Sequence, residues 1–144
     1  MAEERVKQFR GEYSFLSNFY ASEIAYEGLI YPSVENAFQA AKVLDNTKRV
    51  EFTTVKAGSA KKLGRKVLLR SDWNTARIII MKELLIIKFS QEPLRSMLLS
   101  TGNAILEEGN TWNDTFWGIS LKTGRGSNML GRLLMEVRGE LEKQ

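Results

Sequence analysis

Apolar residues recur with a helical period in three segments of the chain. The segment from residue 72 to 89 is apolar on nearly every side, whereas residues 129–142 carry their leucines on one side only. Between residues 33 and 44 the apolar arc comprises Val34, Ala37, Phe38, Ala41 and Leu44. A period near 3.6 residues predicts helices, and the segment that is apolar all round is expected in the interior. Shorter helices are expected at residues 48–56, 59–66 and 91–99.

Strand signals are short and lie beside turn residues. We expect strands at residues 6–10, 23–26, 29–31 and 105–108, of which the middle two form a hairpin about Glu27-Gly28. The 144 residues are enough for one compact domain with a core, and no linker or repeat interrupts them. The pattern therefore predicts a single α+β domain over residues 1–144. It is rich in helix, with a small β-sheet built from the N-terminal strands and the 105–120 region.

The helix expected after Ser33 carries three polar side chains on one flank. Pro32 disfavours the helical conformation at Ser33, which suits an N-cap whose hydroxyl accepts from a first-turn N–H. Glu35, Gln39 and Lys42 follow at spacings of four and three residues, so an acid, an amide and an amine project the same way. Taken alone, this spacing is more typical of a solvated helix face than of a functional site.

Two residue types are missing, and their absence limits the catalytic groups and metal ligands that the chain can offer. The chain has no cysteine, which excludes thiol nucleophiles, disulfides and thiolate metal sites. It has no histidine, which removes the usual general base near neutral pH and most transition-metal sites. An enzyme of this composition must use carboxylates, lysine, tyrosine or hydroxyl groups. Paired carboxylates serve glycosidic chemistry, and a lysine amine can attack an anomeric carbon.

The formal net charge is +4, which suits an anionic ligand such as a phosphate, a nucleotide or a nucleic acid. Positive residues gather at Lys61, Lys62, Arg65 and Lys66, where a phosphate contact and a plain solvated face are both reasonable readings. Residues 1–5 are charged with no apolar run after them, and no segment is long and apolar enough to span a bilayer. We therefore expect a cytoplasmic protein with no signal peptide and no membrane partner.

Aromatic residues cluster in two segments that fit no regular period. Residues 13–20 hold four of them, and Trp112 and Trp117 bracket Asp114. Each segment is either a packed loop or an aromatic wall able to stack on a flat base or sugar. Asp114 either caps backbone N–H groups in a turn or, if desolvated, acts on a substrate. Trp73, in the first turn of the long helix, either staples that helix or lines a pocket.

A glycine-rich loop at residues 124–128 precedes the last helix. Backbone N–H groups at a helix start can bind an anion. The spacing of Gly124, Gly126 and Gly131 matches neither the dinucleotide nor the P-loop pattern, so this signal is weak.

The ordered set of motifs resembles the NADAR superfamily, the YbiA-like proteins. Each piece is weak alone, but together they run in order through essentially the whole chain. One position departs from the pattern, because Asn36 stands where relatives commonly carry histidine. The matching pieces are Phe15-Leu16-Ser17-Asn18-Phe19, Tyr31-Pro32-Ser33-Val34-Glu35, Phe38-Gln39-Ala40, Lys42, Ala60-Lys61-Lys62-Leu63-Gly64-Arg65, Asp72-Trp73, Met81, Lys88-Phe89, Leu98-Leu99, Thr101-Gly102, Leu106-Glu107, Asp114, Trp117-Gly118, Gly126, Asn128, Leu130-Gly131, Leu134-Met135 and Arg138.

The resemblance implies cleavage of an N-glycosidic bond. The implied substrates are a ribosylamino-pyrimidine phosphate of riboflavin biosynthesis or ADP-ribose on modified guanine, including ADP-ribosylated nucleic acid. The implied catalytic residues are Glu35, Lys42 and Asp114, and the scheme needs no metal and no cofactor. The implied substrate-binding residues are Asn18, Phe19, Gln39, Arg65, Trp73, Trp117 and Asn128.

In this scheme Lys42 attacks or electrostatically steers the anomeric carbon and Glu35 moves protons on the ribose or on water. Asp114 positions the ribose hydroxyls or assists as a second carboxylate. Two other classes stay open. A non-catalytic module that binds ADP-ribose or a nucleotide would not need the paired titratable groups. A nucleic-acid-binding protein that relies on the basic residues 61–66 would bind with an affinity that falls steeply with salt.

Overall fold

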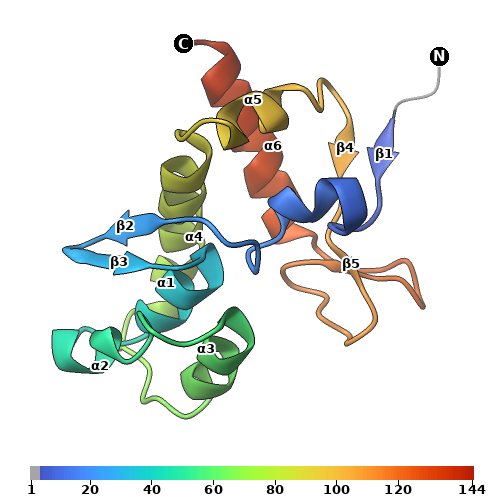
Figure 1. Cartoon of the computed structure of the whole chain (residues 1–144). Coiled ribbons are helices and arrows are strands. Elements are labelled where there is room, and N and C mark those ends of the chain that lie inside the picture. Colours follow the sequence, from blue (N-terminus) through green and yellow to red (C-terminus); the bar gives the residue numbers. More distant parts are fainter. Residues whose placement is uncertain (1–3) are drawn as a thin grey trace. The chain divides into compact units, whose positions relative to one another are not determined.

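The structure is a computed structural model that describes residues 4–144 (Figure 1). Its contacts divide the chain into two compact units. Unit 1 comprises Met1–Ser17 and Phe89–Gln144, and unit 2 comprises Asn18–Lys88. The expectation of a charged N-terminus without a signal peptide rests largely on residues 1–3, which lie outside the described residues. That the whole chain forms one domain stays a prediction.

Unit 1 combines short parallel ladders with helices. The strand β1 (Arg5–Val6) pairs with β4 (Ile105–Leu106), and β5 (Gly109–Asn110) pairs with β6 (Ile119–Ser120). The helices are η1, a 3-10 helix, with α5 and α6; their bounds are Gly11–Leu16, Leu94–Leu99 and Met129–Glu142. The predicted core side of α6 is confirmed, since it buries Leu130, Leu133, Leu134, Val137 and Leu141.

Unit 2 holds a hairpin and the helices α1 to α4. The strands β2 (Ile24–Tyr26) and β3 (Leu29–Tyr31) run antiparallel, as predicted, around a turn in which Glu27 and Gly28 both have positive φ angles. Positive φ at both positions matches the twist of the strands. In Figure 1 this hairpin lies beside α1. The helices span Val34–Ala40, Asn46–Val50, Ala57–Gly64 and Trp73–Phe89, the last residue of α4 belonging to unit 1.

Several sequence-based boundaries were wrong. α1 ends at Ala40, so Leu44, expected in its apolar arc, is 67% exposed. α3 already begins at Ala57, two residues before its expected start. α4 is not buried all round, because Ile79 is 63% exposed. Among the described residues the strands form three separate two-stranded ladders rather than one small sheet. Also within the described part of the chain, no helix is both long and apolar enough to cross a membrane.

A buried arginine ties α2 to the hairpin. The Arg49 side chain is 4% exposed, and its Nη1 donates to Glu27 Oε1 at 2.7 Å. Its Nε donates to Val43 O at 2.9 Å, and the guanidinium lies 5.8 Å from the centroid of the Tyr26 ring. Because both the ion pair and the carbonyl contact are satisfied, this charge is buried without being left uncompensated.

Asn36 has a structural role within unit 2. It is fully buried, and its Nδ2 donates to the carbonyls of Phe52 and Val55 at 2.9 and 2.8 Å. Its Oδ1 accepts from the Ser33 hydroxyl at 2.6 Å. The one departure from the family pattern is therefore turned toward the segment after α2, and it holds that segment against α1.

We expect Asn36→Ala to lower the free energy of unfolding by about 2–3 kcal/mol, because one buried and one part-buried carbonyl lose their donor. Urea unfolding followed by circular dichroism measures this, with the exposed Asn74→Ala in α4 as the matched control. A loss below about 0.5 kcal/mol, the scatter of ordinary surface substitutions, would contradict the structural role.

Candidate active site

Glu35 is held in the first turn of α1. Ser33 caps the helix as predicted, its Oγ accepting from the backbone N–H of Asn36 at 3.1 Å. The Glu35 N–H donates to the carbonyl of Asn18 at 3.0 Å. The Glu35 residue is 7% exposed, and its Oε2 accepts from Gln39 Nε2 at 2.7 Å. A buried carboxylate whose direction is fixed by a neighbouring amide is poised for proton transfer rather than for solubility.

Lys42 follows the C-terminus of α1 and is half-buried. Its Nζ donates to the carbonyl of Gly64, at the end of α3, at 3.2 Å. Burial lowers the pKa of the Lys42 amine below its ordinary value; the Glu35 carboxylate opposes that shift and the Arg65 charge adds to it. A lowered pKa raises the neutral fraction of the amine, which is the form that attacks an electrophile.

The structure thus brings together Glu35, Gln39 and Lys42 within unit 2, as the spacing predicted. It differs from the prediction in that the flank is not solvated, since all seven residues of α1 are buried. The solvated-face interpretation of the α1 flank is therefore wrong.

Asn18 lies next to this row of side chains. Its residue is 9% exposed, and its Nδ2 contacts Met81 Sδ at 3.6 Å. Its Oδ1 is buried and, within residues 4–144, has no hydrogen-bond partner. Buried polar atoms are rarely left in this state, and a ligand O–H or N–H is one way to complete them. The proposed role of Asn18 in substrate binding has this support.

The aromatic and basic side chains predicted near the site differ in exposure. Phe19 is 46% exposed, and Lys61 Nζ lies 5.9 Å from its ring centroid. Arg65 is exposed at the C-cap of α3, where its charge is close enough to shift the Lys42 pKa. Trp73 is 7% exposed and packs on Phe38 with ring centroids 5.0 Å apart. Trp73 therefore packs against α1, a contact that the two sequence-based alternatives did not include, and its contact with a substrate stays a prediction.

Asp114, Trp117 and Asn128 belong to unit 1. The Asp114 Oδ1 accepts from the backbone N–H groups of Phe116 and Trp117 at 3.1 and 2.9 Å. Its own N–H and C=O pair with the Asn110 carboxamide. Asp114 therefore caps a turn, the structural alternative that the sequence left open, and its catalytic role stays a prediction.

Asp114→Asn separates these two roles. Asparagine keeps an oxygen acceptor for the two N–H groups but carries no charge. We expect thermal stability to stay close to wild type and turnover to fall by about 10²-fold or more if the carboxylate acts on substrate. Melting temperature and turnover measured on the same preparation decide this, and an unchanged rate would reduce Asp114 to a capping residue.

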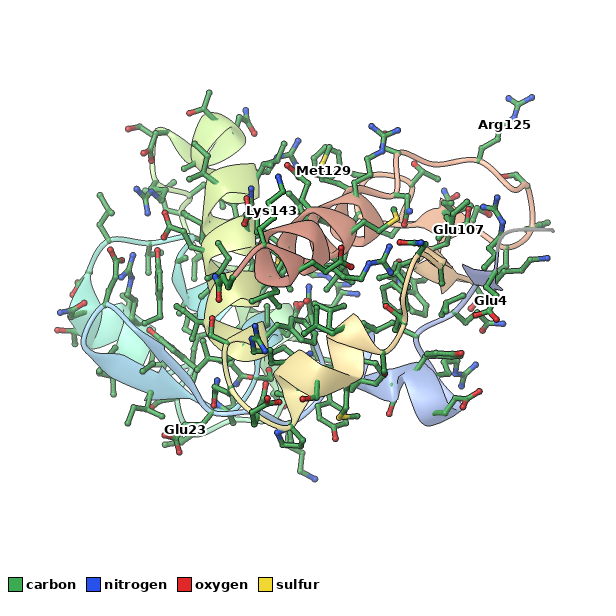
Figure 2. The ribbon with its side chains drawn as sticks, turned by 90° about the horizontal axis from the view of Figure 1, so that it is seen from above. Glu4, Glu23, Glu107, Arg125, Met129 and Lys143 are labelled. Carbon is green, nitrogen blue, oxygen red and sulfur yellow. The ribbon has the colours of Figure 1, made fainter. Side chains whose placement is uncertain are left out.

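The N–H groups where the loop before α6 meets the helix are engaged in hydrogen bonds. Those of residues 127–130 donate to the carbonyls of residues 115–118, all within 2.7–3.2 Å. The Asn128 carboxamide is also engaged, donating to Leu106 O at 2.9 Å and accepting from Glu108 N at 3.0 Å. Figure 2 shows Arg125 at the outer end of this loop, pointing away from α6. The weak sequence signal for an anion site here was wrong, and substrate binding by Asn128 and Trp117 stays a prediction.

Two negative findings concern the described residues. A cavity of about 600 Å³ in unit 2 is lined by Val43, Phe52, Leu63 and their neighbours, but by none of the predicted site residues. No group of three or more acidic side chains that could hold a metal ion occurs among residues 4–144. The candidate site is therefore the flank of α1 with the end of α3. Sequence reasoning missed Gly64, whose carbonyl carries no compositional signal.

The fold combines helices with short ladders, and the candidate site pairs a buried acid on α1 with a half-buried amine just after α1. A comparison with known families identifies the family to which this chain belongs. The chain belongs to the NADAR domain family, whose model matches residues 6–142.

Its relatives carry names that describe an activity. It is 40% identical over 134 residues to the N-glycosidase YbiA of Escherichia coli (strain K12), a match covering 90% of this chain and 82% of that protein. The NMR structure of the Escherichia coli protein YbiA superimposes with a TM-score of 0.85 at 35% identity, covering 99% and 88% of the two chains. The riboflavin biosynthesis protein PYRR of Zea mays is 34% identical over 125 residues, which span 77% of this chain and 20% of that protein.

Proposed function

We propose that this protein is an N-glycosidase. It hydrolyses the bond between a base and a sugar phosphate, either ADP-ribose on guanine or the ribose of a ribosylamino-pyrimidine phosphate. The observation that carries the proposal is the pairing of a buried carboxylate on α1 with an amine just after α1 whose pKa is lowered by burial. A relative named N-glycosidase, matched over 90% of this chain, supports the same activity.

The chemistry follows from what each group can do. The neutral Lys42 amine gives its electron pair to a new bond with the anomeric carbon. The base leaves with the electron pair of the broken N-glycosidic bond and takes up a proton, and the nitrogen of Lys42 gives one up. Glu35 supplies this proton or removes one from the water that later releases the sugar from Lys42. The sum is addition of one water across the N-glycosidic bond, and the amine is regenerated.

Neighbouring groups fit a phosphorylated, flat substrate. Phe19 offers a half-exposed ring on which a base can stack, with the Lys61 ammonium beside it. Arg65 is exposed and can form a forked contact with a phosphate. Asn18 Oδ1 can accept from a sugar hydroxyl or a base N–H.

A release assay tests the proposal. DNA bearing ADP-ribosylated guanine and the ribosylamino-pyrimidine phosphate of the riboflavin pathway are incubated separately with the protein, and the freed base and sugar phosphate are quantified by mass spectrometry. We expect multiple turnovers on one of the two. The exposed Lys48→Ala variant serves as a positive control of the preparation.

The assay also separates the rival classes. Tight binding of either compound without release would show a non-catalytic binding module. Binding of unmodified DNA with equal affinity and a steep salt dependence would indicate the basic cluster of residues 61–66 acting alone. Either outcome overturns the N-glycosidase proposal.

A further inference from the structure

Gly64, the last residue of α3, is buried against the side chain of Gln39. A Cβ placed at Gly64 would overlap the Gln39 Oε1 and lie 2.7 Å from its Cδ. Real Cβ atoms do not approach other atoms so closely, so a side chain at position 64 would force the Gln39 carboxamide out of its place. The Gly64 φ angle is ordinary for a helix, which means that the requirement comes from space and not from backbone conformation.

The orientation of the Gln39 carboxamide is fixed by the hydrogen bond from its Nε2 to Glu35. The Glu35 carboxylate can only accept, so Gln39 must turn its Nε2 toward Glu35 and its Oε1 toward Gly64. That oxygen is buried and has no hydrogen-bond partner among the described residues. The amide is therefore held by one hydrogen bond and by contact with a residue that has no side chain.

Gly64 also contacts the amine of Lys42. Its carbonyl accepts from Lys42 Nζ at 3.2 Å. The backbone of Gly64 thus contacts both the Gln39 amide that orients Glu35 and the Lys42 amine itself.

We propose that Gly64 is a positioning residue that sets the placement of the Glu35 carboxylate and the Lys42 amine relative to each other. This inference rests on the proposed N-glycosidase function, since it assigns a task to that site. Gly64 touches no substrate. It leaves room for the amide that holds the acid, and its carbonyl holds the amine.

Gly64→Ala tests the inference, with Gly58→Ala as the control. Both glycines lie in α3, but a Cβ at Gly58 has no atom within 4 Å. Alanine has the higher helix propensity, so a purely local effect would leave both variants folded and active. We expect kcat of Gly64→Ala to fall about 100-fold, as for a displacement of about 1 Å, with KM little changed. Gly58→Ala keeps the wild-type kcat.

A double variant identifies the group through which Gly64 acts. In Gln39→Ala the carboxamide is gone, so of the three atoms nearest to the Cβ added by Gly64→Ala only the Cβ of residue 39, at 3.2 Å, remains. We expect the double variant to be no slower than Gln39→Ala alone and to regain any melting temperature that Gly64→Ala loses. Full additivity of the two rate losses, or a double variant that fails to fold as Gly64→Ala does, would overturn the inference.

A second measurement does not depend on turnover. The pKa of the Lys42 ammonium is followed by carbon-13 NMR in protein with labelled lysine, the signal being assigned with Lys42→Arg. We expect Gly64→Ala to lower this pKa further, because the ammonium loses part of its hydrogen bond to the residue 64 carbonyl. Gly58→Ala leaves it unchanged.

The turnover and pKa measurements distinguish failure of the proposed N-glycosidase function from failure of the positioning role of Gly64. Wild-type protein that releases no base sinks the proposed function, while the Lys42 pKa still reports on Gly64. Wild-type protein that turns over, with Gly64→Ala unchanged in both kcat and Lys42 pKa, sinks the positioning role alone.

Discussion

Replacing Lys42 by alanine is expected to lower turnover by about 10²–10⁴-fold while the protein stays folded. The side chain is half-buried and makes one hydrogen bond, to Gly64 O, so its loss removes little packing. The amine, to which we assign the attack on the anomeric carbon, is by contrast lost completely. Turnover on the substrate identified by the release assay, together with the melting temperature, measures both consequences.

The pH dependence of the same reaction tells what Lys42 does. A nucleophilic amine must be neutral, so turnover rises with pH until the Lys42 pKa is passed. Since burial lowers this pKa, the rise is expected below the ordinary lysine value of 10.5. A role as a fixed positive charge predicts the opposite sign, with turnover falling as pH passes the same pKa.

Lys42→Arg provides the matched variant. Arginine keeps the positive charge but does not deprotonate in this pH range, so it cannot act as the nucleophile. We expect Lys42→Arg to be as slow as Lys42→Ala, whereas Lys48→Ala, at an exposed position, keeps the wild-type rate. A Lys42→Ala protein with near-normal turnover would remove this residue from the mechanism.

Local signals account for what the sequence predicted well. α1 begins after Ser33 because its hydroxyl caps the first turn, and α6 spans Met129–Glu142 as its leucine period requires. The hairpin follows from Glu27-Gly28, whose positive φ angles only a few residue types tolerate. Each of these features is decided within a few residues of chain, which is the range over which a pattern carries information.

Features that depend on distant parts of the chain were not predictable. α1 is buried on both flanks because α3 and the segment after α2 cover it, and nothing in its own residues says so. Lys88 is a charged residue in an otherwise largely apolar helix, yet it is fully buried with its Nζ 5.4 Å from the centroid of the Tyr20 ring, and burial lowers its pKa to about 7. Ladders of two residues are too short for an alternating pattern to place them.

The candidate site also combines features that the local sequence predicts with features that depend on distant parts of the chain. The spacing of Glu35, Gln39 and Lys42 put an acid, an amide and an amine together: α1 determines the directions of Glu35 and Gln39, and Lys42 follows directly after its C-cap. It could not supply Gly64, which comes from another helix and contributes only backbone. For Asp114 the sequence named capping and catalysis as alternatives, and the structure shows its carboxylate capping two N–H groups.

Glu35→Gln is expected to lower turnover by a similar 10²–10⁴-fold, with the fold retained. Glutamine has nearly the same shape, and its Oε1 can still accept from Gln39 Nε2, which reaches Glu35 Oε2 at 2.7 Å in the wild type. The backbone bond from residue 35 to Asn18 O does not involve the side chain. What disappears is the charge and the ability to gain or lose a proton.

Glu35→Gln is also expected to change the pKa of Lys42. The Glu35 carboxylate raises the Lys42 pKa against the effect of burial, so its neutralisation should lower that pKa further. The rising limb of turnover in Glu35→Gln would then move to lower pH, although the maximal rate is small. Glu51→Gln, at an exposed position after α2, should change neither quantity. If Glu35→Gln turns over at the wild-type rate, the buried acid of α1 has no part in the chemistry, and proton transfer must come from another group.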